Sequence, residues 1–127
     1  MTRLCDCVQH MDHRGYSQRI QFVLEYVHQH YDDCNLSLKT LADKLSINPA
    51  YLGRMFSEET GVYFTEYLNE IRIHRAKELL DTTPMKLAEV AEQVGISNVS
   101  YFSTIYKRFT GERPGQSRKY RKGPSER

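Results

Sequence analysis

The chain has 127 residues and a formal net charge of +2, which suits one compact domain or two small subdomains. It contains no run of 18 apolar residues and no signal-peptide pattern, so we expect no membrane contact and a cytoplasmic location. The three cysteines suggest no disulfide framework, which agrees with a reducing compartment.

Residues 1–16 lack helical or strand periodicity and are expected to be a disordered leader or the remnant of a linker. They contain Cys5, Cys7, His10 and His13, which invite a metal hypothesis. Four ligands so close in sequence, without a framework to fix tetrahedral geometry, make a weak site. We therefore expect neither a metal nor another cofactor.

Residues 17–63 are predicted to form a first subdomain of three helices. Apolar residues at spacings of three and four indicate a covering helix that begins at Ser17. Ser37 then caps a short helix, and after a tight turn Asn48 caps a longer helix over residues 49–60.

Residues 64–83 are predicted to form a linker helix. Its apolar side chains recur at helical spacing, and Thr65 is the expected N-cap. Pro84 ends the helix because the residue before a proline is pushed out of the α region.

Residues 84–114 are predicted to form a second subdomain, because residues 87–111 repeat the pattern of residues 38–61. Each copy indicates a short helix, a turn and a longer helix ended by a glycine, which is the helix-turn-helix pattern. The sequence thus predicts an all-α fold of about seven helices, with two such subdomains joined by the linker helix. The plain alternative for each copy is an αα-hairpin that contacts no nucleic acid.

The linker helix and the second copy also carry residues whose spacings resemble the DNA-binding domain of the AraC family of bacterial transcription activators. The resemblance covers about residues 20–114. It implies that the second helix of each unit enters a DNA major groove and that the protein activates transcription through RNA polymerase. The matching residues are Tyr67, Arg72, Ile73, Ala76, Leu79, Leu80, Ala91, Gly95, Ile96, Tyr101, Phe102, Ser103, Tyr106, Lys107, Gly111 and Pro114.

In the first copy, residues 49–60 place Ala50, Gly53 and Arg54 opposite the apolar stripe, and we interpret them as base-contacting residues. Arginine bidentate to guanine is the commonest specific contact, and an alanine can meet a thymine methyl. Gly53 is interpreted as a position left bare for close approach to DNA, since a glycine within a helix costs about 1 kcal/mol relative to alanine. The candidate phosphate contacts are Asn48, Tyr51 and Ser57.

In the second copy, the corresponding outward residues are short and uncharged. The family often has an arginine where this chain has Thr104, and hydroxyl groups discriminate weakly between bases. We therefore expect the second helix to contribute positioning and phosphate contact more than base choice. The candidate base contacts are Val99, Ser100, Ser103 and Thr104, and the candidate phosphate contacts are Asn98, Lys107 and Arg108.

The charge is distributed unevenly. Residues 1–83 hold nine Lys and Arg against twelve Asp and Glu, a net of −3, whereas residues 84–127 hold nine against four, a net of +5. A basic second half fits phosphate contact. Residues 115–127 form a basic segment in which Gly115 weakens the family's short closing helix, and Ser117 stands where an aromatic residue is typical. We expect that helix to be short, shifted or loose.

The resulting hypothesis is a sequence-specific regulator that binds double-stranded DNA, with two helices in successive major grooves of one asymmetric site. The competing classes are an all-helical protein-interaction adaptor and an enzyme. The outward stripes are polar or small, which disfavours the adaptor, and no nucleophile–base pair or phosphate loop indicates an enzyme. The isolated chain is expected to be monomeric. If it is part of a longer protein, the whole protein can dimerise through a further domain.

Overall fold

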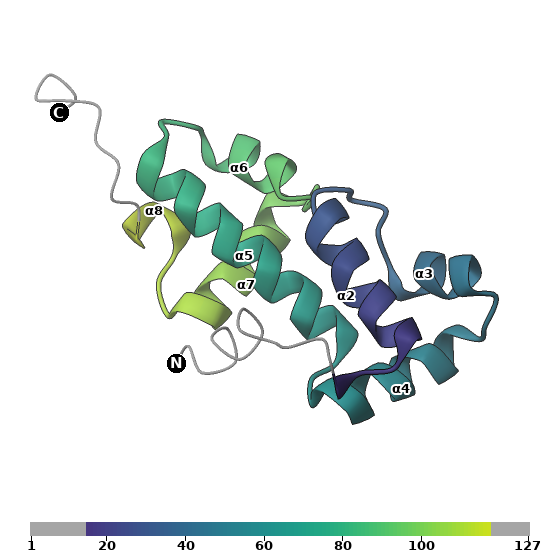
Figure 1. Cartoon of the computed structure of the whole chain (residues 1–127). Helices are drawn as coiled ribbons and strands as arrows, with labels where there is room; N and C mark the ends of the chain where they lie inside the picture. Colours follow the sequence, from purple (N-terminus) through teal and green to yellow (C-terminus); the bar gives the residue numbers. More distant parts are fainter. Residues whose placement is uncertain (1–14, 118–127) are drawn as a thin grey trace, which may run out of the picture.

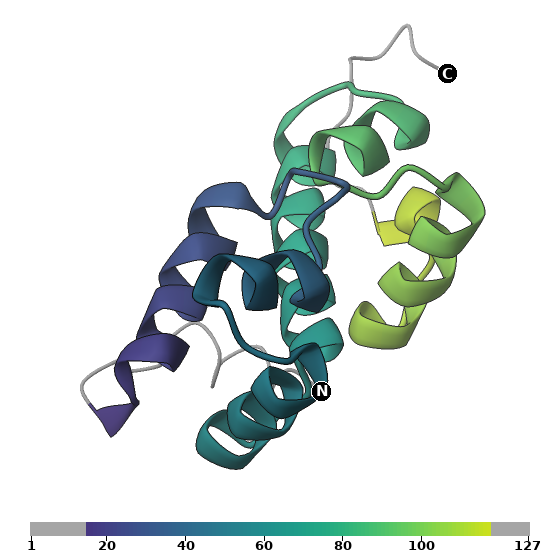
Figure 2. The ribbon, with the colours of Figure 1, turned by 90° about the vertical axis from the view of Figure 1, so that its right-hand side faces the viewer.

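The computed structural model describes residues 15–117, and in that range the chain consists of seven helices and no strands. Figures 1 and 2 show α5 between two groups of helices, with α2, α3 and α4 on one side and α6, α7 and α8 on the other. The prediction of an all-α fold is confirmed for this part of the chain. The helices are α2 (Gln18–His30), α3 (Leu38–Leu45), α4 (Pro49–Thr60), α5 (Phe64–Thr82), α6 (Leu87–Gln93), α7 (Val99–Thr110) and α8 (Pro114–Ser117).

Side-chain caps set the starts of the first three helices, as the sequence predicts. The Ser17 hydroxyl accepts from the Ile20 amide at the start of α2. Ser37 and Thr40 form a reciprocal capping box at the start of α3. The Asn48 side chain accepts from two amides of α4. Each cap satisfies amides that have no partner within their own helix.

The linker helix α5 serves both groups of helices. Its first half packs into a core with α2, α3 and α4, which together form the first subdomain; its second half packs with α6 and α7, which with α8 form the second subdomain. The buried residues of the first half are Phe64, Tyr67, Leu68 and Ile71, and those of the second half are Ile73, Ala76, Leu79 and Leu80. Tyr31, which follows α2, packs against both cores.

The predicted N-cap of this helix, Thr65, is wrong by two residues. Helix α5 begins at Phe64, its N-cap is Tyr63 without a side-chain cap bond, and Thr65 is an exposed residue of the first turn. Phe64 is 5% exposed and lies edge-on to the ring of Phe56 in the first core. Burial of that aromatic ring outweighs a threonine cap, which contributes about 1 kcal/mol.

Helix α8 is described over Pro114–Ser117, and Ser117 is the last residue that the structure describes, so the expected weakness of the closing helix stays a prediction. Tyr120 and Arg121, where the family's aromatic–arginine pair is shifted, lie outside the described residues, as do Cys5, Cys7, His10 and His13. In residues 15–117, no helix is long and apolar enough to cross a membrane, and no group of three or more His, Cys, Asp or Glu side chains is placed to hold a metal.

Candidate nucleic-acid interface

The outward face of α4 carries one exposed cation. Leu52 and Phe56 are fully buried on the inner face, while Ala50 and Arg54 are exposed on the other. The Arg54 side chain makes no hydrogen bond or ion pair with any residue in the part of the chain that the structure describes. A guanidinium without a partner inside the protein keeps its five N–H donors available for another molecule.

Gly53 has a packing reason that the sequence did not reveal. A Cβ atom at this position would lie 2.9 Å from Cδ2 of Leu38 on α3. Leu38 Cδ2 is the end of a flexible side chain, which would have to shift to admit that atom, so the glycine eases the packing of α3 against α4. The predicted contact of Gly53 with a base stays a prediction, and this packing gives a second reason for the glycine.

The three candidate phosphate contacts of α4 differ in how many of their polar atoms already form hydrogen bonds within the protein. Asn48 Oδ1 accepts from the amides of Ala50 and Tyr51 at 2.7 and 3.2 Å, which leaves the Asn48 side-chain amide as a donor. The Tyr51 side chain is 49% exposed. The Ser57 hydroxyl donates to the Arg54 carbonyl at 3.1 Å. Asn48 and Tyr51 are thus the freer donors toward a phosphate.

The outward face of α7 carries hydroxyl groups in place of the arginine. Val99, Ser100 and Thr104 are exposed, Ser103 is half-buried, and Phe102 is buried on the inner face. The Thr104 hydroxyl donates to the Ser100 carbonyl at 3.0 Å, so its proton is already engaged within the helix. At the start of α7, Asn98 Oδ1 accepts from the Tyr101 amide at 2.9 Å. The Ser100 and Ser103 hydroxyls on this face can each donate or accept, which fits the predicted weak discrimination between bases.

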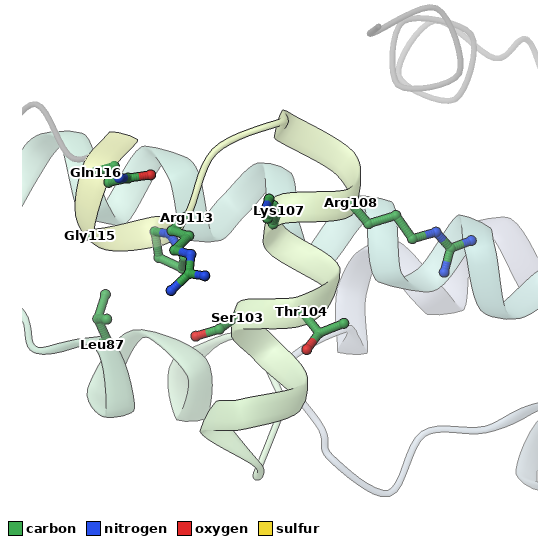
Figure 3. A pocket seen from close by; sticks show the side chains of 9 residues that line it. Leu87, Ser103, Thr104, Lys107, Arg108, Arg113, Gly115 and Gln116 are labelled. Atoms are coloured by element: carbon green, nitrogen blue, oxygen red, sulfur yellow. The ribbon is translucent and has the colours of Figure 1, made fainter.

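An open hollow of about 810 Å³ lies between α6, α7 and α8. Figure 3 shows Arg113 reaching into it from the start of α8, toward Leu87 and Ser103, with Lys107 on the neighbouring helix. Neither cation has an ion-pair partner among the residues described here. Arg113 was not among the predicted site residues. Its place in the Gly111-to-Pro114 turn, directly after α7, was the signal that could have found it.

Arg108 also lines that hollow, and its guanidinium forms an ion pair with Glu66 on α5 (Figure 3). It also lies over the ring of Phe109, 5.4 Å from the ring centroid. Lys107 and Arg108 therefore line the same hollow, but the Arg108 guanidinium is already paired within the protein. Exposed ion pairs contribute only about 0–1 kcal/mol, so a DNA phosphate can compete with Glu66, and the predicted phosphate contact stays a prediction.

Comparisons with known proteins agree with this geometry. The model of a family described as "Helix-turn-helix domain" matches residues 41–120. The chain is 39% identical over 94 residues to the uncharacterized transcriptional regulatory protein YesN of Bacillus subtilis, covering 72% of this chain and 26% of that protein. It is 28% identical over 118 residues to the arabinose operon regulatory protein of Escherichia coli, covering 93% and 40%.

A solved structure supports the same assignment. The C-terminal domain of AraT, a response regulator from Geobacillus stearothermophilus, superimposes with a TM-score of 0.78 at 36% identity, covering 83% of this chain and 87% of that domain. Two helix-turn-helix units on a shared helix define a DNA-binding domain of a transcription regulator. The chain belongs to the AraC family, as its sequence resemblance indicates. It spans 26% and 40% of the lengths of the two curated relatives named here.

Proposed function

We propose that this chain inserts α4 and α7 into successive major grooves on one side of an asymmetric DNA site, and that α4 supplies most of the base choice. The observation that carries this proposal is the contrast between the two helices at equivalent positions. Arg54 of α4 is exposed and has no described partner, while Thr104 of α7 is uncharged and bonded within its own helix.

The phosphate contacts of the second subdomain come from Lys107 and Arg113 in this proposal. Both lie at the hollow beside the outward face of α7, and a cation there faces the DNA backbone when α7 enters a groove. Such contacts add affinity without sequence information and make binding sensitive to salt. Because both units share one chain, two-site contact needs no dimer, and the second unit binds at high effective concentration.

The activity of the whole regulator is a second part of the proposal. Relatives in this family are named as regulators of operons, which supports a role in transcription for this chain as well. We infer activation through contact with RNA polymerase in the cytoplasm. The adaptor alternative is not favoured by the family assignment.

The test is selection of binding sites from a random duplex library at two salt concentrations, with Arg54→Ala and Thr104→Ala as a matched pair. The parent chain is expected to select two half-motifs about 10 base pairs apart, one well defined and one shallow. Arg54→Ala should relax one guanine of the defined half-motif at a cost of about 1–3 kcal/mol. Thr104→Ala should change the other half-motif by less.

Three outcomes would contradict the proposal. If Thr104→Ala costs more base discrimination than Arg54→Ala, the roles of the two helices are reversed. If binding is strong but shows no sequence preference, the proposed base contacts are wrong and only the proposed phosphate contacts are supported. If no duplex binds at low salt, the chain does not read DNA and the adaptor hypothesis takes its place.

A further inference from the structure

The loop after α2, residues 31–33, lies between the two subdomains and is held by a buried arginine of α5. Arg72 Nε donates to the Tyr31 carbonyl at 2.8 Å, and its Nη2 donates to the Asp33 carbonyl at 2.9 Å. Arg72 is 7% exposed, and this burial lowers its pKa from the ordinary value while Cys34 and Asp33 oppose the shift. A planar guanidinium that donates to two carbonyls restrains both the position and the rotation of the loop.

The second subdomain contacts the same loop with its backbone. Gly95, in the turn between α6 and α7, has a φ of +89°, and a Cβ atom there would lie 2.5 Å from the Tyr31 carbonyl oxygen. The same atom would lie 3.0 and 3.1 Å from the carbonyl carbon and Cα of Asp32. The turn therefore fits against the loop only without a side chain. The loop is fixed from one side by α5 and from the other by the second subdomain.

Two further contacts join α7 to the half of α5 that packs in the first subdomain. Asn69 is 5% exposed, and its Nδ2 donates to the Tyr101 hydroxyl at 3.1 Å. Glu66 forms the ion pair with Arg108. Glu66, Asn69 and Arg72 follow one another at intervals of three residues and therefore share one face of the helix. That polar face of α5 makes the side-chain contacts across the subdomain boundary.

We propose that Arg72 and Asn69 are positioning residues that fix the distance and rotation between α4 and α7, and thereby set the spacing of the two half-motifs that the chain accepts. The proposal rests on the proposed function for its consequence on DNA, but its structural part concerns the protein alone.

The distance between α4 and α7 explains why such contacts matter, because a small change in the angle between the subdomains moves one helix far relative to the other. Long helices bend gently, because their backbone hydrogen bonds lengthen at little cost, so α5 alone leaves the angle between the subdomains soft. Successive major grooves lie roughly 34 Å apart. Over that distance, a rotation of one subdomain by about 6° would displace its DNA-binding helix, α4 or α7, by roughly 3.5 Å, which is one base-pair step. Contacts that hold the angle between the subdomains within a few degrees therefore restrict binding to one spacing of the two half-motifs.

The first test measures the distance between the subdomains without DNA. Spin labels are placed at the exposed Lys39 of α3 and Glu92 of α6, with Cys5, Cys7 and Cys34 replaced by serine. Electron–electron double resonance should give a narrow distance distribution in this parent. Arg72→Lys keeps the charge but not the two-pronged bond, and it should broaden or shift the distribution. Arg19→Lys is the matched control, because Arg19 is exposed in the first turn of α2 and makes no hydrogen bond or ion pair with a residue of the described range 15–117.

Tyr101→Phe covers the case in which Arg72→Lys does not fold. It removes only the hydroxyl that Asn69 contacts, on a residue that is 46% exposed, and it should broaden the distribution by a smaller amount. The proposal is overturned if folded Arg72→Lys gives the same distribution as Arg19→Lys. If Arg72→Lys does not fold, an unchanged distribution in Tyr101→Phe overturns it.

The second test uses duplexes whose half-motifs are moved apart or together by one base pair. The parent should lose about tenfold in affinity on each change, because a second unit that is held at the wrong spacing no longer contributes to binding. Arg72→Lys should lose less on these changes while binding a duplex with one half-motif as the parent does. A purely structural role would lower affinity for every spacing equally and would contradict the proposal. If the parent binds no duplex, the proposed function fails, and the distance measurement still decides the positioning role.

Discussion

The two helix-turn-helix units share the same backbone at the points where the backbone is constrained. Asn48 and Asn98 use side-chain oxygens to cap α4 and α7, the two helices that we propose to read DNA and call the reading helices. Gly61 and Gly111 end the same helices with φ of +84° and +87°. These residues are alike because a helix start needs an acceptor and a left-handed end favours glycine.

The two units differ in the turn between their helices and on the outward face of their second helix. In the turn between their two helices, the first unit has Ser46 with a φ of 59° and the second has Gly95 with a φ of 89°. On the reading helices, the first has Arg54 where the second has Thr104. The two units are therefore alike where the fold constrains the backbone, and they differ where one unit contacts the other subdomain and where we propose a contact with DNA.

The largest expected effect comes from Gly95→Ala, compared with Gly111→Ala. Both glycines have nearly the same positive φ, so both variants carry a left-handed penalty of about 1–2 kcal/mol. Only Gly95 faces the Tyr31 carbonyl, whereas nothing lies within 4 Å of a Cβ atom at Gly111. Gly95→Ala should therefore cost about 2–4 kcal/mol of the free energy of unfolding, measured by urea denaturation. Equal losses in the two variants would show that the contact between the subdomains contributes nothing.

The next prediction converts the second reading helix toward the first. Thr104→Arg places a guanidinium at the position equivalent to Arg54 and should make the shallow half-motif prefer a guanine by about 1–3 kcal/mol. Site selection with the variant measures this preference. Affinity that rises equally for all sequences would mean that position 104 faces the DNA backbone and not the bases.

The smallest effect is expected from Ser46→Gly. Ser46 is exposed and holds a left-handed conformation that glycine adopts without strain, so the variant should gain about 0.5–1 kcal/mol in stability. The shift of the thermal midpoint measures it. A loss of stability would show that the serine side chain contributes more to the turn than its backbone strain costs.

Local signals were enough to predict most of the fold. The caps Ser17, Ser37, Asn48 and Asn98, and the terminal glycines, lie where their helix ends require them. The start of α5 was missed because burial of Phe64, a tertiary effect, overrides the local preference for Thr65 as a cap.

Contacts between distant residues were not predictable from local signals. Gly53 meets Leu38 on another helix, and Arg72 bonds a loop about 40 residues earlier in the chain. No spacing in the sequence indicates these pairs, since they depend on how the helices pack. The same limit applies to the ion pair of Arg108 with Glu66.

Hydroxyl-radical footprinting of the parent chain on its selected site reports the positions of both units on DNA in one experiment. If α4 and α7 enter successive major grooves, two protected segments should lie on the same side of the duplex, with centres about 10 base pairs apart. Arg54→Ala should weaken both segments together, since one rigid chain makes them. A single protected segment, or two that lie on opposite sides of the duplex, would contradict the claim that α4 and α7 bind as one fixed pair.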